Sequence, residues 1–195
     1  LIDNACSGVN SFAGVSITNP VTINGRLDVT LDGGGVYRPN GWTNNMIVVQ
    51  ASNVIFNDLV MVNATGPALW DGSGIMVGDA QTDITLNNVS ISNSKNAGFG
   101  TTPWVNLATN ISTGTSKVSI IGGNFSNNGT AGVVVSHSDD LLIDGGVFNQ
   151  NGTHGVYLNG DTYNHVVNPL PGDGYIPTTD LNNAIGVTNS RVLNV

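Results

Sequence analysis

The sequence has few charged residues, few bases and no long apolar run. Of its 195 residues only 9% are charged, and 5 Lys and Arg stand against 13 Asp and Glu, which gives a net charge of -8. Without a basic patch the chain cannot release counterions from a polyanion, so neither nucleic acid nor an anionic membrane is expected as a partner. A polyanionic substrate would need a metal ion to mediate its binding. No apolar run approaches the roughly 18 residues of a membrane-spanning helix.

Cysteine is almost absent. Cys6 stands alone, so the chain has no internal disulfide; Cys6 is either a free thiol, a small buried side chain, or the partner of a cysteine elsewhere. The chain starts at Leu1 without a signal peptide, which predicts a mature form or an excised piece. It is poor in Lys, Glu and Leu, which disfavours helices, but 39% of it is hydrophobic, which argues against disorder.

Glycine and asparagine are abundant, and one phrase occurs twice. "VSIIGGNFSNNGTAGVVV" from Val118 to Val135 returns as "LLIDGGVFNQNGTHGVYL" from Leu141 to Leu158, with nine of 18 positions identical. A repeat this short is one structural unit used again, not a duplicated domain.

Each unit opens with a short apolar strand whose alternate residues face one way. The five segments are "VTLDG" from Val29, "VIFND" from Val54, "ITLNN" from Ile84, "VSIIGG" from Val118 and "LLIDGG" from Leu141, and they start 25, 30, 34 and 23 residues apart. The second residue of the turn pair that follows is always Gly, Asp or Asn, which accept a positive φ.

Two more strands complete the unit. A second strand places an apolar residue at Val36, Met61, Ile91, Phe125 and Phe148, and a third strand begins at Met46, Gly74, Gly98, Gly132 and Gly155. Three short strands per coil of about 23–34 residues predict an all-β parallel solenoid, because stacked coils bury a continuous core. An antiparallel sandwich, the alternative, would not repeat a three-strand phrase at such an interval.

We therefore expect residues 1–195 to form a single β-helix domain, a segment of a longer chain, with loop excursions at 101–116 and 159–183. The chain starts and stops on apolar strands, near Ile2 and Val192. We expect ends of this kind to expose unpaired strand edges and to self-associate into a longer solenoid.

These coils resemble the right-handed parallel β-helix repeats of the pectate-lyase-like superfamily. "LLIDGGVFNQNGTHGVYL" and "TDITLNNVSISNSKNAGFG" from Thr82 are most similar to coils of mannuronan C5-epimerase catalytic modules, and the resemblance covers roughly residues 28–158. It implies a right-handed β-helix, an extracellular location (secreted, or on a cell or virion surface) and a polysaccharide bound along the third-strand face.

The catalytic signature of the epimerases, Tyr-Gly-Phe-Asp-Pro-His, is not retained. The equivalent stretch is "NAGFGTTPW", with Ala97, Gly100 and Thr102 where the family has Tyr, Asp and His. Neither Ala nor Gly can exchange the C5 proton of a sugar, so an active epimerase is not expected. Asp139-Asp140 and the "THG" at Thr153 only loosely mimic the motifs of polygalacturonases. Whether the chain is a lyase, a glycosidase, an epimerase-like enzyme or no enzyme stays open.

The candidate carbohydrate-binding residues are Tyr157, Asn159 and Asp161. Alternation turns Tyr157 and Asn159 outward on the third strand, where Tyr157 could stack on a sugar ring while Asn159 and Asp161 accept hydrogen bonds from hydroxyls. The alternative is an ordinary exposed tyrosine. His154 lies on the opposite side of the strand, above Ala131, and is interpreted as a surface residue.

The candidate catalytic residues are His137, Asp139 and Asp140, in the turn "SHSDD" after a third strand. A histidine beside carboxylates could act as an acid or base; the alternative is a solvated turn. No cofactor is expected, except that Asp139, Asp140 and Asp161 are the candidates for a structural calcium ion. No Asp-x-Asp-x-Asp loop supports such a site.

Six Asn-x-Ser/Thr sequons occur about as often as chance predicts, at Asn63, Asn88, Asn110, Asn124, Asn128 and Asn151. We expect several of these side chains to form hydrogen-bonded ladders along the solenoid axis. Two functional hypotheses remain: a carbohydrate-binding or carbohydrate-active β-helix, and a structural or adhesive solenoid of a stalk, fibre or filament.

Overall fold

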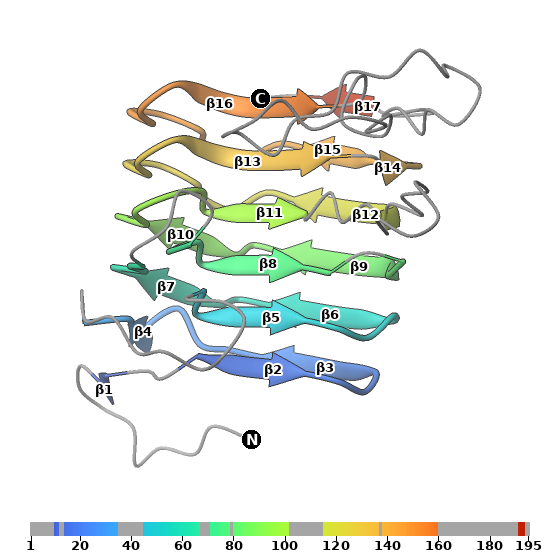
Figure 1. Cartoon of the computed structure of the whole chain (residues 1–195), viewed down its shortest axis with the longest axis horizontal. Coiled ribbons are helices and arrows are strands. Elements are labelled where there is room, and N and C mark those ends of the chain that lie inside the picture. The colour runs from blue at the N-terminus through green and yellow to red at the C-terminus, as the bar shows by residue number, and fades with distance from the viewer. Residues whose placement is uncertain are drawn as a thin grey trace, which may run out of the picture.

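The chain folds into a parallel β-solenoid in which three strands form each coil. A computed structural model describes residues 10–11, 14–34, 45–66, 71–78, 80–101, 115–136, 138–159 and 191–193. Coil is stacked on coil from the N-terminal to the C-terminal end (Figure 1), and every strand pair is parallel. In the described residues no helix is long and apolar enough to cross a membrane.

The strands stack into three sheets. The six-stranded sheet, called sheet B below, holds β2 (Val15–Ile17), β5 (Ile47–Val49), β8 (Ile75–Val77), β11 (Phe99–Thr101), β13 (Ala131–Ser136) and β16 (His154–Asn159). The seven-stranded sheet C holds β3 (Val21–Asn24), β6 (Val54–Asn57), β9 (Thr82–Asn87), β12 (Thr115–Ile121), β15 (Leu142–Asp144) and β17 (Arg191–Leu193), with β14 (Ser138–Asp139) beside the start of β12. The four-stranded sheet A holds β1 (Asn10–Ser11), β4 (Thr30–Asp32), β7 (Val60–Val62) and β10 (Ser90–Ser92).

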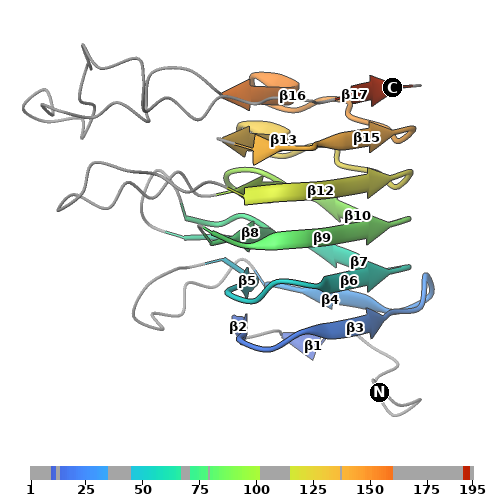
Figure 2. The same cartoon turned by 90° about the vertical axis from the view of Figure 1, so that its right-hand side faces the viewer.

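The chain passes from sheet B to sheet C to sheet A and back. It winds in the right-handed sense (Figures 1 and 2), as parallel crossovers nearly always do. Residues 102–114 and 160–190, which are outside the described residues, both join sheet B to sheet C in the sequence. Most of the two predicted excursions falls in these stretches, although Thr101 ends β11 and Thr115 begins β12.

The core consists of inward columns that run along the axis. Ile84, Val118 and Leu141 stack above Val54, and all four are buried, as the alternation predicted. The second-strand column of Met61, Ile91, Phe125 and Phe148 is confirmed in the same way, with the Phe125 and Phe148 rings stacked 5.5 Å apart. The third strands pair in the predicted register from Ile47 to Val156.

The first coil was aligned wrongly from the sequence. "VTLDG" from Val29 does not stack under "VIFND": Leu31 pairs with Met61 in sheet A, and Val21 pairs with Val54 in sheet C. The partner of "VIFND" is "VTING" from Val21. Both segments read Val-Thr-aliphatic-polar-Gly, so alternation cannot choose between them; only stacking on the next coil does. Val36, which was assigned to the second strand, lies outside the described residues.

The corners of the coils are marked by columns of left-handed residues. Four of the five second members of the predicted turn pairs, Asp58, Asn88, Gly122 and Gly145, have a positive φ between 51° and 73°, as the pattern predicted. In the misaligned first coil the prediction was wrong by one residue, because the positive φ falls on Gly34 and not on Gly33. Two further columns share this conformation. Asn53, Asp83, Lys117 and Asp140 lie just before or within the first residues of the sheet C strands, and Asn63, Asn93, Asn127 and Gln150 follow the sheet A positions. Asn and Asp tolerate this region better than other residues with a Cβ.

Asparagine ladders run along the axis, as expected, although not only at the sequon residues. Asn87 donates to Asn57 at 2.7 Å, and Asn57 donates to Asn24 at 2.8 Å. Inside the solenoid, the Asn128 side-chain oxygen accepts from the Ser94 backbone N–H, and that of Asn151 accepts from the Asn128 backbone N–H. These bonds tie each coil to the next one.

The repeated phrase is explained by stacking alone. The two residues of each identical pair lie one above the other in successive coils. The pairs are core residues, left-handed or close-packed glycines, stacked phenylalanine rings, hydrogen-bonded asparagines and threonines. They are Ile120/143, Gly122/145, Gly123/146, Phe125/148, Asn128/151, Gly129/152, Thr130/153, Gly132/155 and Val133/156. A methyl group on Gly152 would lie 2.0 Å from the carbonyl oxygen of Gly129. The shared residues therefore specify the coil, and any binding site has to come from the positions that differ.

Candidate functional site

The outer face of sheet B has one central column, formed by Ser16, Val48, Met76, Gly100, Val134 and Tyr157 in successive strands. Val48 and Met76 are only 7% and 6% exposed, although neither belongs to the inner core cluster. The face is thus covered at β5 and β8. It opens toward the C-terminal coil, where Tyr157 is 40% exposed. Ser16 on β2 is exposed as well, so among the described strands the predicted groove is interrupted at β5 and β8 and does not run along the whole face.

Tyr157 forms an exposed aromatic pair with His154. Their ring centroids are 4.9 Å apart and the planes meet at 23°. The His154 Nδ1 also lies 3.0 Å from the Thr153 hydroxyl, which helps to orient the imidazole. His154 is exposed and pairs with Ala131, as expected. The prediction that it lies on the opposite side of the strand from Tyr157 was wrong, because its ring stacks on that of Tyr157.

A signal for this pair was present in the repeat. The two phrases differ at the positions Ala131/His154 and Val134/Tyr157, where the register pairs small or aliphatic residues of β13 with aromatic residues of β16. The nine identical positions build the coil, whereas the variable positions carry the exposed aromatic side chains. The other two candidates for carbohydrate binding are only partly placed: the backbone of Asn159 pairs with Ser136 at the end of β16, and Asp161 lies outside the described residues.

The predicted catalytic turn is not a simple loop. Ser138 and Asp139 form β14, which pairs with Thr115 and Ser116 of sheet C, and Ser138 is fully buried. Asp140 is exposed and has a φ of 57°. The residues at the equivalent corner of three other coils, Asn53, Asp83 and Lys117, also have a positive φ. The position of Asp140 is thus explained by the corner it forms. His137 lies outside the described residues.

A metal centre finds no support in the part of the chain that the structure describes, where no group of three or more His, Cys, Asp or Glu side chains could hold an ion. The side chain of Asp139, like Asp161, is outside that part. At the epimerase positions, Ala97 is a buried methyl group and Gly100 offers no side chain to the outer face of β11. Thr102 is not among the described residues.

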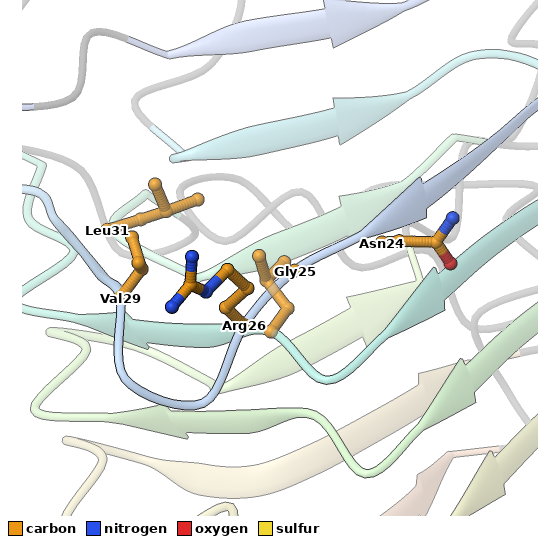
Figure 3. Close-up of a pocket in the computed structure, with 6 residues that line it drawn as sticks. Asn24, Gly25, Arg26, Val29 and Leu31 are labelled. Atoms are coloured by element: carbon orange, nitrogen blue, oxygen red, sulfur yellow. The ribbon is translucent and has the colours of Figure 1, made fainter. Parts of the chain in front are cut away.

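A small pocket lies where the chain leaves β3 (Figure 3). It is lined by Asn24, Gly25, Arg26, Val29, Leu31 and Leu59, and its volume of about 10 Å³ leaves room for no more than a water molecule. Beside it the exposed Arg26 guanidinium donates two hydrogen bonds to Asp28 and lowers the pKa of that carboxyl. The pocket is too small to be a site for a sugar.

A comparison of the chain with family models, curated proteins and solved structures found no match in any of the three. What is shown is the β-solenoid itself, by its parallel pairing and stacked register.

Proposed function

We propose that this protein is an extracellular β-helix module that recognises a neutral polysaccharide through the His154–Tyr157 pair on sheet B. The observation that carries the proposal is the exposed stacked pair at the C-terminal end of a face whose middle, at Val48 and Met76, is covered. Flat aromatic rings with a polar edge are suited to the apolar face and the hydroxyls of a sugar ring.

The charge of the chain selects the class of glycan. A net charge of -8 repels polyuronates and sulfated glycans unless a cation screens them, so the ligand is neutral. A calcium ion at Asp139, Asp140 and Asp161 would be the exception. Equal thermal stability in calcium and in a chelator would count against that ion.

The test is a glycan array probed with the whole chain and with three variants. Tyr157→Ala should abolish binding to the neutral glycans that the parent binds, His154→Ala should weaken it, and Tyr157→Phe should largely retain it because the ring remains. Val147→Ala, which shortens an equally exposed side chain outside sheet B, is the matched control. Binding that is unchanged in Tyr157→Ala would contradict the proposal.

A second function, a structural or adhesive solenoid that self-associates, is favoured by the nine repeated positions, which all serve stacking. In that case no glycan would be bound, and sedimentation at rising concentration would show growth into filaments. We also expect no epimerase or lyase activity on alginate, since Ala97 and Gly100 offer no acid or base. New guluronate signals in proton NMR, or absorbance from unsaturated ends, would overturn that expectation.

A further inference from the structure

A second concave surface lies at the corner where the chain leaves sheet A. This depression has a volume of about 360 Å³ and is lined by Asp32, Gly34, Asn63, Ala64, Thr65, Asn93 and Lys95. Its residues come from three successive coils, because they lie at the end of β4 or shortly after β4, β7 and β10. The volume falls in the range of small-molecule sites and suits a single ring rather than a long chain.

The polar groups of the depression are held in place. Asp32 Oδ1 accepts from the Gly34 backbone N–H at 2.7 Å and from Asn63 Nδ2 at 2.8 Å. These two bonds fix the plane of the carboxylate and leave its other oxygen as an oriented acceptor. They also direct the Asn63 side-chain oxygen away from Asp32 as a second acceptor.

Donors complete the lining. Lys95 is exposed, and its ammonium donates to the Gly66 carbonyl oxygen, which uses one of its three hydrogens. Asn93 is exposed at a φ of 56°, so its carboxamide can both donate and accept. The lining has one carboxylate and one ammonium and thus no net charge, and its only buried apolar side chain is Ala64.

We infer that this depression is a second binding site for a neutral, hydroxyl-rich ring, a single pyranose unit of a glycan. Balanced charge disfavours ions, the lack of large apolar side chains disfavours apolar ligands, and fixed donors and acceptors at close range match vicinal hydroxyls. The inference rests on the proposed function only for the class of ligand, because the His154–Tyr157 pair lies in another sheet and several coils away (Figure 1).

The experiment is a titration of the isotope-labelled whole chain, followed by amide proton–nitrogen NMR spectra, with methyl α-D-glucopyranoside, methyl α-D-mannopyranoside and methyl β-D-galactopyranoside. Sodium glucuronate is the charged counterpart. We expect at least one neutral glycoside to shift the amides of Gly34, Asn63, Asn93 and Lys95. A shift of these amides by glucuronate alone, or by no compound at its solubility limit, would overturn the inference.

Two variants locate the ligand without disturbing the fold. Asn93→Gly removes the carboxamide at a left-handed position that glycine accepts, and Asp32→Asn removes the charge but keeps an acceptor for Gly34. Each should weaken binding at least tenfold. Asn127→Gly is the matched control, since Asn127 has a φ of 59° one coil above Asn93 and does not line the depression. Binding that survives both variants, or that is lost equally in the control, would overturn the site.

Tyr157→Ala separates this inference from the proposed function. If array binding is lost in Tyr157→Ala while the glycoside shifts remain, both sites stand. If Tyr157→Ala removes the glycoside shifts and the depression variants do not, the proposed function holds and the second site does not exist. If the depression variants remove both array binding and the glycoside shifts while Tyr157→Ala removes neither, the depression is the glycan site and the proposed role of Tyr157 is contradicted.

Discussion

Lys117 occupies a backbone position that is unusual for its side chain. Its φ is 52°, in a column whose other members are Asn53, Asp83 and Asp140. A lysine has no side-chain oxygen that could stabilise this conformation locally, so the conformation costs about 1–2 kcal/mol. Its contact with Asp83, with 3.7 Å between Nζ and Oδ1, is exposed on both sides and offsets little of that cost.

Lys117→Gly should therefore stabilise the protein, by about 0.5–1 kcal/mol, after the greater freedom of glycine in the unfolded chain is taken into account. Urea denaturation measures the change. Asp83→Gly is the comparison, and it should alter stability by less than about 0.5 kcal/mol because aspartate already tolerates this region. A destabilised Lys117→Gly variant would show that the ion pair with Asp83 matters more than the backbone.

At Gly152 the available space, and not the backbone φ, determines the effect of a substitution on stability. A methyl group there would lie 2.0 Å from the Gly129 carbonyl oxygen of the preceding coil. We expect Gly152→Ala to lower the free energy of unfolding by about 2–3 kcal/mol. In Gly78→Ala the nearest atom would be at 3.3 Å, so that control should change stability much less in the same denaturation assay. Equal losses in the two variants would argue against close stacking of the coils.

At the scale of elements, the ladder of Asn24, Asn57 and Asn87 fastens β3, β6 and β9 along one corner of sheet C. Figure 2 shows these strands lying one above another. The middle rung takes part in two side-chain hydrogen bonds, and the first rung takes part in one. The ladder ends at Ile121, which pairs with Asn87, because an isoleucine side chain has no carboxamide group.

Removing the middle rung should cost about twice as much as removing the first. Asn57→Ala is expected to destabilise by about 1–3 kcal/mol and Asn24→Ala by about 0.5–1.5 kcal/mol, since each lost bond contributes roughly the latter amount. Thermal unfolding of the two variants in parallel checks the ratio. Equal effects would mean that solvent replaces the ladder bonds without cost.

At the scale of the whole molecule, stability comes from each coil packing on its neighbours, so damage to one coil should spread unevenly. Leu141 is 1% exposed in the inward column of sheet C, whereas the next residue, Leu142, faces outward and is half-buried. In sheet C, β15 pairs with β12 on one side and with β17 on the other.

Leu141→Asp should destabilise the protein by about 3–5 kcal/mol, because it places an unpaired charge in the core. Hydrogen exchange should accelerate first in β15 and β13, and least in β6. Leu142→Asp, one residue along the chain, should cost far less. Thermal unfolding of Leu141→Asp that matched the parent would mean that the assigned inward face is wrong.

Local pattern in the sequence was sufficient for the coil and its corners. Alternation at Ile84, Val118 and Leu141 specifies which side is buried, because successive side chains of a strand point to opposite faces. Residue type specifies where φ turns positive, because only Gly, Asn and Asp do so at low cost. The same reasoning fell short at Lys117, whose left-handed backbone is imposed by its place in the column and not by its own preference.

Stacking decided the rest. "VTING" and "VTLDG" have the same local pattern, and only the fit onto β6 and β7 assigns Val21 to sheet C and Leu31 to sheet A. Likewise His154 stacks on Tyr157, and Asp32, Asn93 and Lys95 line one depression, only because strand register and coil stacking bring them to one surface. Sequence by itself determined what each coil is, since that depends on neighbours in the chain; which residues share a surface depends on neighbours in space.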